Sequence, residues 1–131
     1  MQYPVYYEWD DDEKTAVRYI AQGRWTWKDD HRAVHVSQFA LANGADQIDT
    51  IIDLSHSTGT PSGATAHVRT FGKQQHPKQT GRTVVIGMEP ENVLKLAGTE
   101  GILRVANEHV IHFVESEEEA QTLLAEWRRA R

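Results

Sequence analysis

The chain is predicted to be an α/β domain with a mixed, largely parallel sheet. Short apolar runs of strand length alternate with longer stretches of helical periodicity, and helix-capping residues precede two of those stretches. Strands that alternate with helices form parallel sheets joined by right-handed crossovers. The length of 131 residues suits one domain. We therefore expect a single domain over residues 1–131, with five strands and about four helices in the order β-β-α-β-α-β-α-β-α.

The first element is predicted to be a β-hairpin. Val5, Tyr7 and Trp9 alternate with more polar positions, and a similar alternation returns over residues 17–25. The acidic run at residues 10–13 separates the two segments and suits a solvated turn. This pattern indicates two strands with one face toward solvent.

A helix over residues 27–43 is expected next. Thr26 and Asp29 have the spacing of a capping box, and Asn43-Gly44 is expected to end the helix in a left-handed conformation. The apolar residues of its buried face recur every seven positions, at Trp27, Val34 and Leu41.

The middle of the chain combines a buried strand with a polar loop. Residues 47–54 are rich in isoleucine and read as a strand inside the sheet, and residues 55–63 that follow are dense in hydroxyl groups and turn formers. A weaker helical pattern then continues through Ala64, Val68 and Phe71.

The second half repeats the alternation of strand and helix. Residues 83–88 are apolar on both faces, as expected for a central parallel strand, and Pro90 suits the first turn of the next helix. The last strand is expected at residues 109–114. Ser116 then begins a capping box for the closing helix, which presents an apolar stripe.

Composition excludes several classes of function. The 14 basic and 19 acidic residues give a net charge of −5, which argues against a nucleic-acid partner. The absence of cysteine excludes disulfides and thiol nucleophiles. No segment approaches the roughly 18 apolar residues of a membrane span, and residues 1–9 contain no basic residue or long apolar run. We therefore expect a cytoplasmic protein without a membrane span.

Four short stretches carry a resemblance to a known family. They are Ile51-Ile52-Asp53-Leu54-Ser55, Ser62-Gly63, Val84-Val85-Ile86-Gly87, and the ending Phe113-Val114-Glu115-Ser116 that runs into Glu117-Glu118-Glu119-Ala120. Together with the element order, they resemble the STAS domain (sulfate transporter and anti-sigma-factor antagonist) of the SpoIIAA-like superfamily. The resemblance covers most of the chain, and it implies a SpoIIAA-like fold and a regulatory role.

The resemblance also implies a phosphoacceptor. In the anti-sigma-factor antagonists, a partner kinase phosphorylates the first serine of an Asp-Ser-Ser-Gly motif, and this position falls on Ser62. Here Pro61 stands in place of the acidic residue, and Gly63 in place of the second serine. The chain therefore resembles a divergent member of this superfamily, and it is more similar to the SpoIIAA-like proteins that lack the motif.

The polar loop is the candidate binding site. Open α/β sheets bind ligands where a strand ends and the next helix begins. The expected ligand- or partner-binding residues are Asp53, Ser55, His56, Ser57, Thr58, Thr60, Ser62 and Gly63, with Trp25 and Trp27 as walls of a shallow apolar pocket or of a partner surface. The alternative is structural: Ser62 caps a helix, the other hydroxyls are solvated, and Trp27 anchors the core.

Three functions follow from this sequence. The first is a non-enzymatic regulatory or binding module that acts through loop 55–63 on a protein partner or small ligand, with anti-sigma-factor antagonism as one form. The alternative is a small-molecule or lipid carrier, as in Sec14-like proteins. A small hydrolase that uses Asp53, His56 and a hydroxyl is the third, although no Gly-x-Ser-x-Gly elbow is present. Whether the chain forms a homodimer is not determined by the sequence.

No catalytic residue, cofactor or metal is expected. His31 and His35 are four residues apart on the predicted helix, but the glutamate of a His-Glu-x-x-His pattern does not follow His31. No Gly-rich phosphate-binding motif occurs either.

Overall fold

Six strands form one mixed sheet in the computed structural model, which describes residues 3–69 and 75–131. The strands are β1 (Val5–Trp9), β2 (Ala16–Gly23), β3 (Ile48–Ser57), β4 (Gln79–Ile86), β5 (Ile102–Val105) and β6 (His109–Val114). Their order across the sheet is β1-β2-β3-β4-β6-β5. Strands β2, β3, β4 and β6 run parallel, and β1 and β5 pair antiparallel at the two edges.

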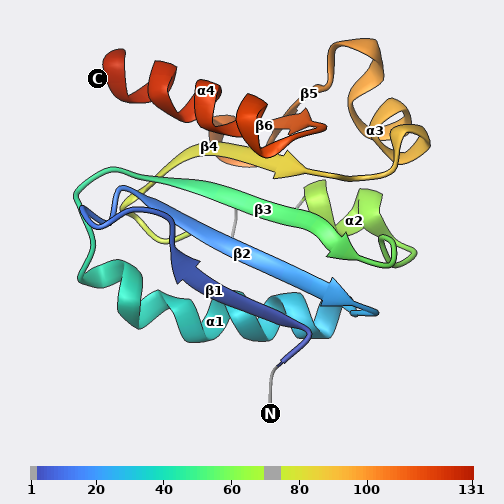
Figure 1. Ribbon diagram of the computed structural model, residues 1–131, viewed down its shortest axis with the longest axis horizontal. Helices are drawn as coiled ribbons and strands as arrows, with labels where there is room; N and C mark the ends of the chain where they lie inside the picture. The colour runs from blue at the N-terminus through green and yellow to red at the C-terminus, as the bar shows by residue number, and fades with distance from the viewer. Residues whose placement is uncertain (1–2, 70–74) are drawn as a thin grey trace.

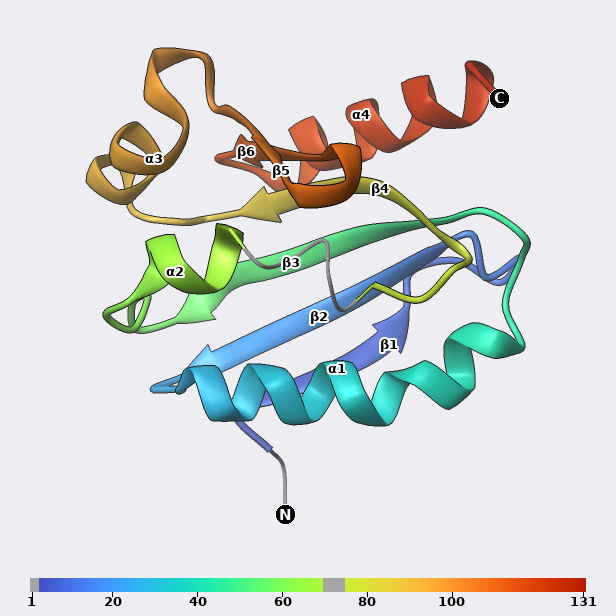
Figure 2. The same ribbon diagram turned by 180° about the vertical axis from the view of Figure 1, so that it is seen from behind.

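Helices cover the two faces of the sheet unequally (Figure 1). They are α1 (Trp27–Ala42), α2 (Ala64–Arg69), α3 (Pro90–Ala97) and α4 (Glu117–Arg129). Helices α1 and α2 pack on one face and α4 on the other, while α3 lies beyond the carboxyl end of β4 (Figures 1 and 2). The expected α/β class, mostly parallel sheet and four helices are confirmed.

The expectation of five strands is wrong, because β5 forms a sixth. Its four residues were too few to show a strand period, and a one-turn 3-10 helix, Ala106–Glu108, connects it directly to β6. Ile102 pairs with His112 and Val105 with His109. This short antiparallel strand covers the edge that β6 would otherwise expose. The observed order is β-β-α-β-α-β-α-β-β-α.

Strand β3 continues three residues past its predicted end. Its pairing with β2 resumes after an irregularity between Ile20 and Gln22, where Ile20 pairs with Asp53 and Gln22 with His56. Ile20 and Gln22 are two residues apart and therefore lie on the same face of β2. The extra residue in β3 consequently brings Asp53 and His56 to one face, and the loop shortens to residues 58–63.

The predicted caps of α1 and α4 are confirmed. Thr26 and Asp29 form a reciprocal capping box, and the Ser116 hydroxyl accepts the backbone N–H of Glu119. The predicted left-handed end of α1 is wrong, since Asn43 has a φ of −100° and Gly44 is not among the described glycines with a positive φ. Gly44 is required by space instead, because a Cβ atom there would lie 2.5 Å from the Trp9 ring. The predicted helical position Phe71 lies outside the described residues.

Two hydrophobic layers hold the sheet. The layer beneath α1 and α2 includes the buried residues Val17, Tyr19, Leu41, Ile48, Leu54 and Val85. The layer beneath α4 includes Ile51, Val84, Ile86, Leu124 and Trp127. Helix α4 packs on β4 and β6, and in the described part of the chain no helix lies over β1 and β2 on this face (Figure 1).

Candidate functional site

A narrow apolar cavity lies between α1, α2 and the sheet. It has a volume of about 50 Å³, and its lining residues place it near the carboxyl ends of β3 and β4. These strand ends point toward the side of the molecule where α1 begins (Figure 2). The strands contribute mainly aliphatic side chains, among them Ile52, Leu54, Val85 and Ile111, and α1 adds Val34. The described polar residues of its lining are Asp30, His31, His67 and Gln75. This combination of apolar walls and few polar groups is typical of small-molecule sites.

Aromatic rings form one wall of the cavity. The rings of Trp25 and Trp27 meet edge to face with centroids 5.0 Å apart, and Trp27 stacks on His67 at 4.5 Å. The ring centroid of His31 lies 5.2 Å from that of His67, so His31 extends the aromatic cluster along α1. Because Trp27 and His67 belong to different helices, their stacking joins the start of α1 to α2.

The loop of residues 58–63 is held from both sides. The indole Nε1 of Trp27 donates a hydrogen bond of 2.7 Å to the carbonyl of Ser62, next to the cavity. On the other side, the backbone N–H of Thr60 donates to Glu89, 2.9 Å away at the start of α3. The loop therefore has a defined conformation at the rim of the aromatic wall.

Asp30 is a residue of the cavity lining whose carboxyl has a shifted pKa. It lies in the first turn of α1 and is half-buried. Burial raises the pKa of its carboxyl to about 6, and the neighbouring His31 only partly opposes that shift. A carboxyl with a raised pKa in an apolar cavity is a feature of functional sites.

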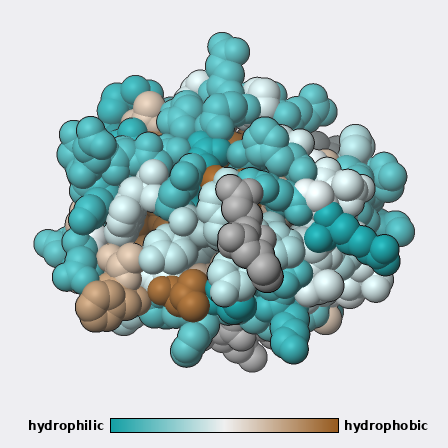
Figure 3. All heavy atoms as spheres, turned by 60° about the horizontal axis from the view of Figure 1, so that its bottom comes forward, coloured by the Kyte–Doolittle hydropathy of each residue, from teal (hydrophilic) through white to brown (hydrophobic). Residues whose placement is uncertain are grey.

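Little apolar surface competes with the cavity as a binding site on the α1 side. The exposed large apolar side chains of α1 are Val36 and Phe39, with 44% and 82% of their surfaces exposed. Figure 3 shows this side as mostly hydrophilic, with a small hydrophobic patch. Single exposed apolar side chains such as these are ordinary on a protein surface.

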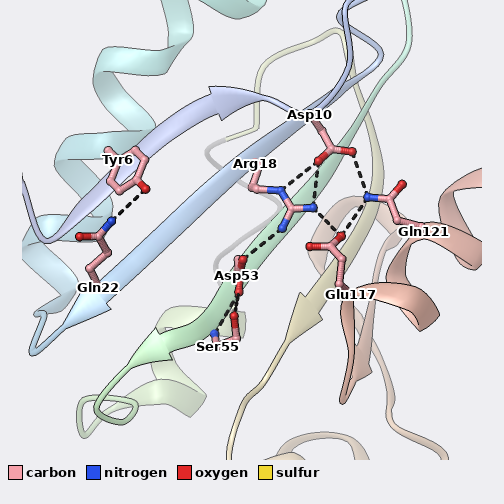
Figure 4. A network of polar contacts seen from close by, with 8 residues as sticks. All are labelled: Tyr6, Asp10, Arg18, Gln22, Asp53, Ser55, Glu117 and Gln121. Carbon is pink, nitrogen blue, oxygen red and sulfur yellow. Dashed lines mark hydrogen bonds and ion pairs between the residues drawn. The ribbon is translucent and has the colours of Figure 1, made fainter.

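A second polar cluster lies on the opposite face of the sheet, around Arg18 (Figure 4). The Arg18 side chain donates to Asp10 at 2.9 Å, to Asp53 at 3.1 Å and to Glu117 at 2.6 Å. Gln121 donates to both Asp10 and Glu117. Arg18 is only 7% exposed, so the cluster joins the β1–β2 turn, β3 and α4 through one buried cation.

The charges of this cluster are mutually satisfied. The hydrogen bond from Arg18 lowers the pKa of Glu117, and this effect outweighs the burial that would raise it. Burial alone would lower the pKa of Arg18, but hydrogen bonds to Glu117 and Asp10 raise it instead. Arg18 and Glu117 thus each stabilise the charged form of the other, as expected within a structural ion-pair network.

The site residues that the sequence predicted lie in two groups, one on each face of the sheet. Asp53 and His56 line the surface around Arg18, and Ser55 donates to Asp53 at 2.5 Å. Trp25 and Trp27 line the cavity on the other side. Gly63 lies next to it, where an added Cβ atom would be 3.7 Å from His67.

The remaining loop hydroxyls have separate positions. Ser57 donates to the carbonyl of Leu54 at 2.8 Å, and the backbone N–H of Thr58 donates to the carbonyl of Gly23. The Ser62 side chain is exposed. Within residues 3–69 and 75–131, no hydrogen bond joins Ser55 to His56, so these two side chains do not form the serine–histidine pair of a hydrolase.

Sequence reasoning missed Asp30, His31, His67 and Gln75 as cavity residues and Arg18 as a network centre. Asp30 reads as an ordinary first-turn acid, and His67 lies 40 residues from Trp27. One available signal was the charge of Arg18 in the otherwise apolar run of β2, since a charge at a buried strand position requires a partner.

Searches of family models, curated proteins and solved structures gave no match to this chain. Among the described residues, no cluster of three histidine or carboxylate side chains could hold a metal ion. None of the helices in residues 3–69 and 75–131 has the length and hydropathy of a membrane span.

Replacing Arg18 should destabilise the fold strongly. Arg18→Met leaves the carboxylate of Asp53, which is 8% exposed, without its cationic partner. We expect the free energy of unfolding in denaturant to fall by about 3–5 kcal/mol. The control Arg104→Met changes an exposed arginine of β5 and should shift it by less than about 0.5 kcal/mol. Equal effects of the two substitutions would contradict the structural role of the network.

Asp30 should make stability depend on pH in a defined direction. Its carboxyl ionises more readily in the unfolded chain, because the folded pKa is raised from 3.8 to about 6. The contribution of this group is therefore complete below pH 4 and is lost as the pH rises through 6. The Asn side chain of Asp30→Asn does not ionise and therefore escapes this loss. When the pH is raised from 4 to 7.5, the unfolding free energy of the variant minus that of the wild type should increase by about 1–2 kcal/mol.

Thermal or urea unfolding at both pH values measures this difference. Burial lowers the pKa of His109 and of the half-buried His112 in the wild type and the variant alike, so the contribution of these two histidines cancels. Asp12→Asn, at an exposed position, is the control and should differ from the wild type by the same amount at both pH values. A pH-independent difference for Asp30→Asn would disprove the assignment.

Proposed function

We propose that this chain is a non-enzymatic, SpoIIAA-like binding module that holds a small, mostly apolar molecule in the cavity between α1 and α2. The observation that carries the proposal is the apolar cavity walled by Trp25, Trp27 and His67 at the carboxyl ends of β3 and β4. Open α/β sheets bind ligands at this end. The mixed sheet and its element order are compatible with the SpoIIAA-like resemblance.

The size of the cavity favours a ligand of about one ring over a lipid. An apolar cavity of about 150 Å³ holds one benzene molecule, whereas this cavity measures about 50 Å³. A ring therefore enters by parting the walls, and α2 has one buried side chain, Val68, to resist that movement. A lipid tail would demand a much larger rearrangement, which makes a Sec14-like carrier the weaker alternative.

Ser62 belongs to this proposal as the rim residue of the same site. Its side chain is exposed, and its carbonyl accepts the hydrogen bond from Trp27. A phosphate at Ser62, as in an antagonist-like switch, would add charge beside the aromatic wall. Occupation of the cavity and modification of the rim would then influence each other.

Binding of toluene tests the proposal. We expect toluene to bind at millimolar concentration or tighter and to shift the indole N–H resonances of Trp25 and Trp27 in NMR spectra. Val34→Phe fills the cavity and should weaken binding at least tenfold. Val36→Phe makes the same change on the exposed side of α1 and should leave binding unchanged.

Two results would overturn this function. One is the absence of saturable toluene binding to the wild type. The other is equal binding by Val34→Phe and Val36→Phe, because it would place the bound molecule outside the cavity.

A further inference from the structure

Two buried polar atoms of the cavity residues have no hydrogen-bond partner. The indole Nε1 of Trp25 is a donor without an acceptor, and the side-chain Oε1 of Gln75 is an acceptor without a donor. Both residues line the cavity, and Trp25 is only 6% exposed. Buried polar groups are nearly always paired in folded proteins, so an unpaired donor and an unpaired acceptor at one cavity require an explanation.

We propose that the cavity recognises an uncharged carboxamide attached to an aromatic ring, an inference that rests on the proposed binding function. The amide carbonyl would accept from Trp25 Nε1, and the amide N–H would donate to Gln75 Oε1. A planar amide that contacts both atoms would supply both missing partners. The attached ring would occupy the apolar part of the cavity, beside Val34 and Leu54.

Other polar groups fit this pair of atoms less well. An ester carbonyl can accept from Trp25, but it has no hydrogen to donate to Gln75. A carboxylate likewise only accepts, and it would bring a second negative charge close to Asp30. A hydrocarbon leaves both protein atoms unpaired. The expected order of affinity is therefore amide, then ester, then hydrocarbon.

A titration with three matched probes tests the inference. Benzamide, methyl benzoate and toluene share one aromatic ring and differ in the polar group. We expect the wild type to bind benzamide about three- to tenfold more tightly than methyl benzoate, the gain typical of one neutral hydrogen bond. Gln75→Met should bring the ratio of benzamide affinity to methyl benzoate affinity close to one, and toluene affinity measures any change that the substitution makes to the cavity itself. Gln47→Met, at an exposed position, should retain the preference for benzamide.

The Trp25 indole resonance gives a readout that needs no variant. In the wild type, benzamide and methyl benzoate should move this proton downfield as it gains an acceptor. Toluene offers no acceptor, so the shift that its aromatic ring causes should lack this downfield contribution. Equal affinities for benzamide and methyl benzoate would overturn the carboxamide inference, and so would an unmoved Trp25 resonance. If toluene binds in that case, the apolar site stands without its polar specificity. If none of the three probes binds, the proposed function itself fails.

Discussion

The arrangement of this fold depends on the ion pairs that the buried guanidinium of Arg18 forms. Arg18 lies in β2 and binds carboxylates from the β1–β2 turn, from β3 and from α4. A buried cation must keep its partners, since removing one leaves an uncompensated charge in a poorly solvated place. These bonds fix the start of α4 against the half of the sheet that the helix does not cover (Figure 4).

The two faces of the sheet differ in whether their buried polar groups have hydrogen-bond or ion-pair partners. Around Arg18, each charged group has a partner that stabilises its charge. In the cavity on the other face, Trp25 and Gln75 have unpaired atoms, and the pKa of Asp30 is raised by burial. Complete pairing supports a structural role, whereas unpaired groups beside an apolar cavity support recognition of another molecule. This contrast is the basis for proposing a structural role for one face and a binding role for the other.

Local patterns predicted most of the fold but only part of the site. Caps such as Thr26 and Ser116 act over one helical turn, so spacing alone located both helix starts. The four-residue strand β5 is too short to show a period, and the extension of β3 depends on pairing with β2. Trp25 and Trp27 were recognisable as aromatic walls. Asp30, His67 and Gln75 gain their significance only when α1, α2 and the sheet meet.

The central claim is that an accessible apolar cavity exists between α1 and α2, and crystals held under xenon pressure test it most directly. Xenon occupies apolar cavities without making hydrogen bonds. We expect xenon density among Trp25, Val34, Leu54 and Val85 in the wild type and its loss in Val34→Phe. Density confined to other sites, or ordered water filling this space, would contradict the account.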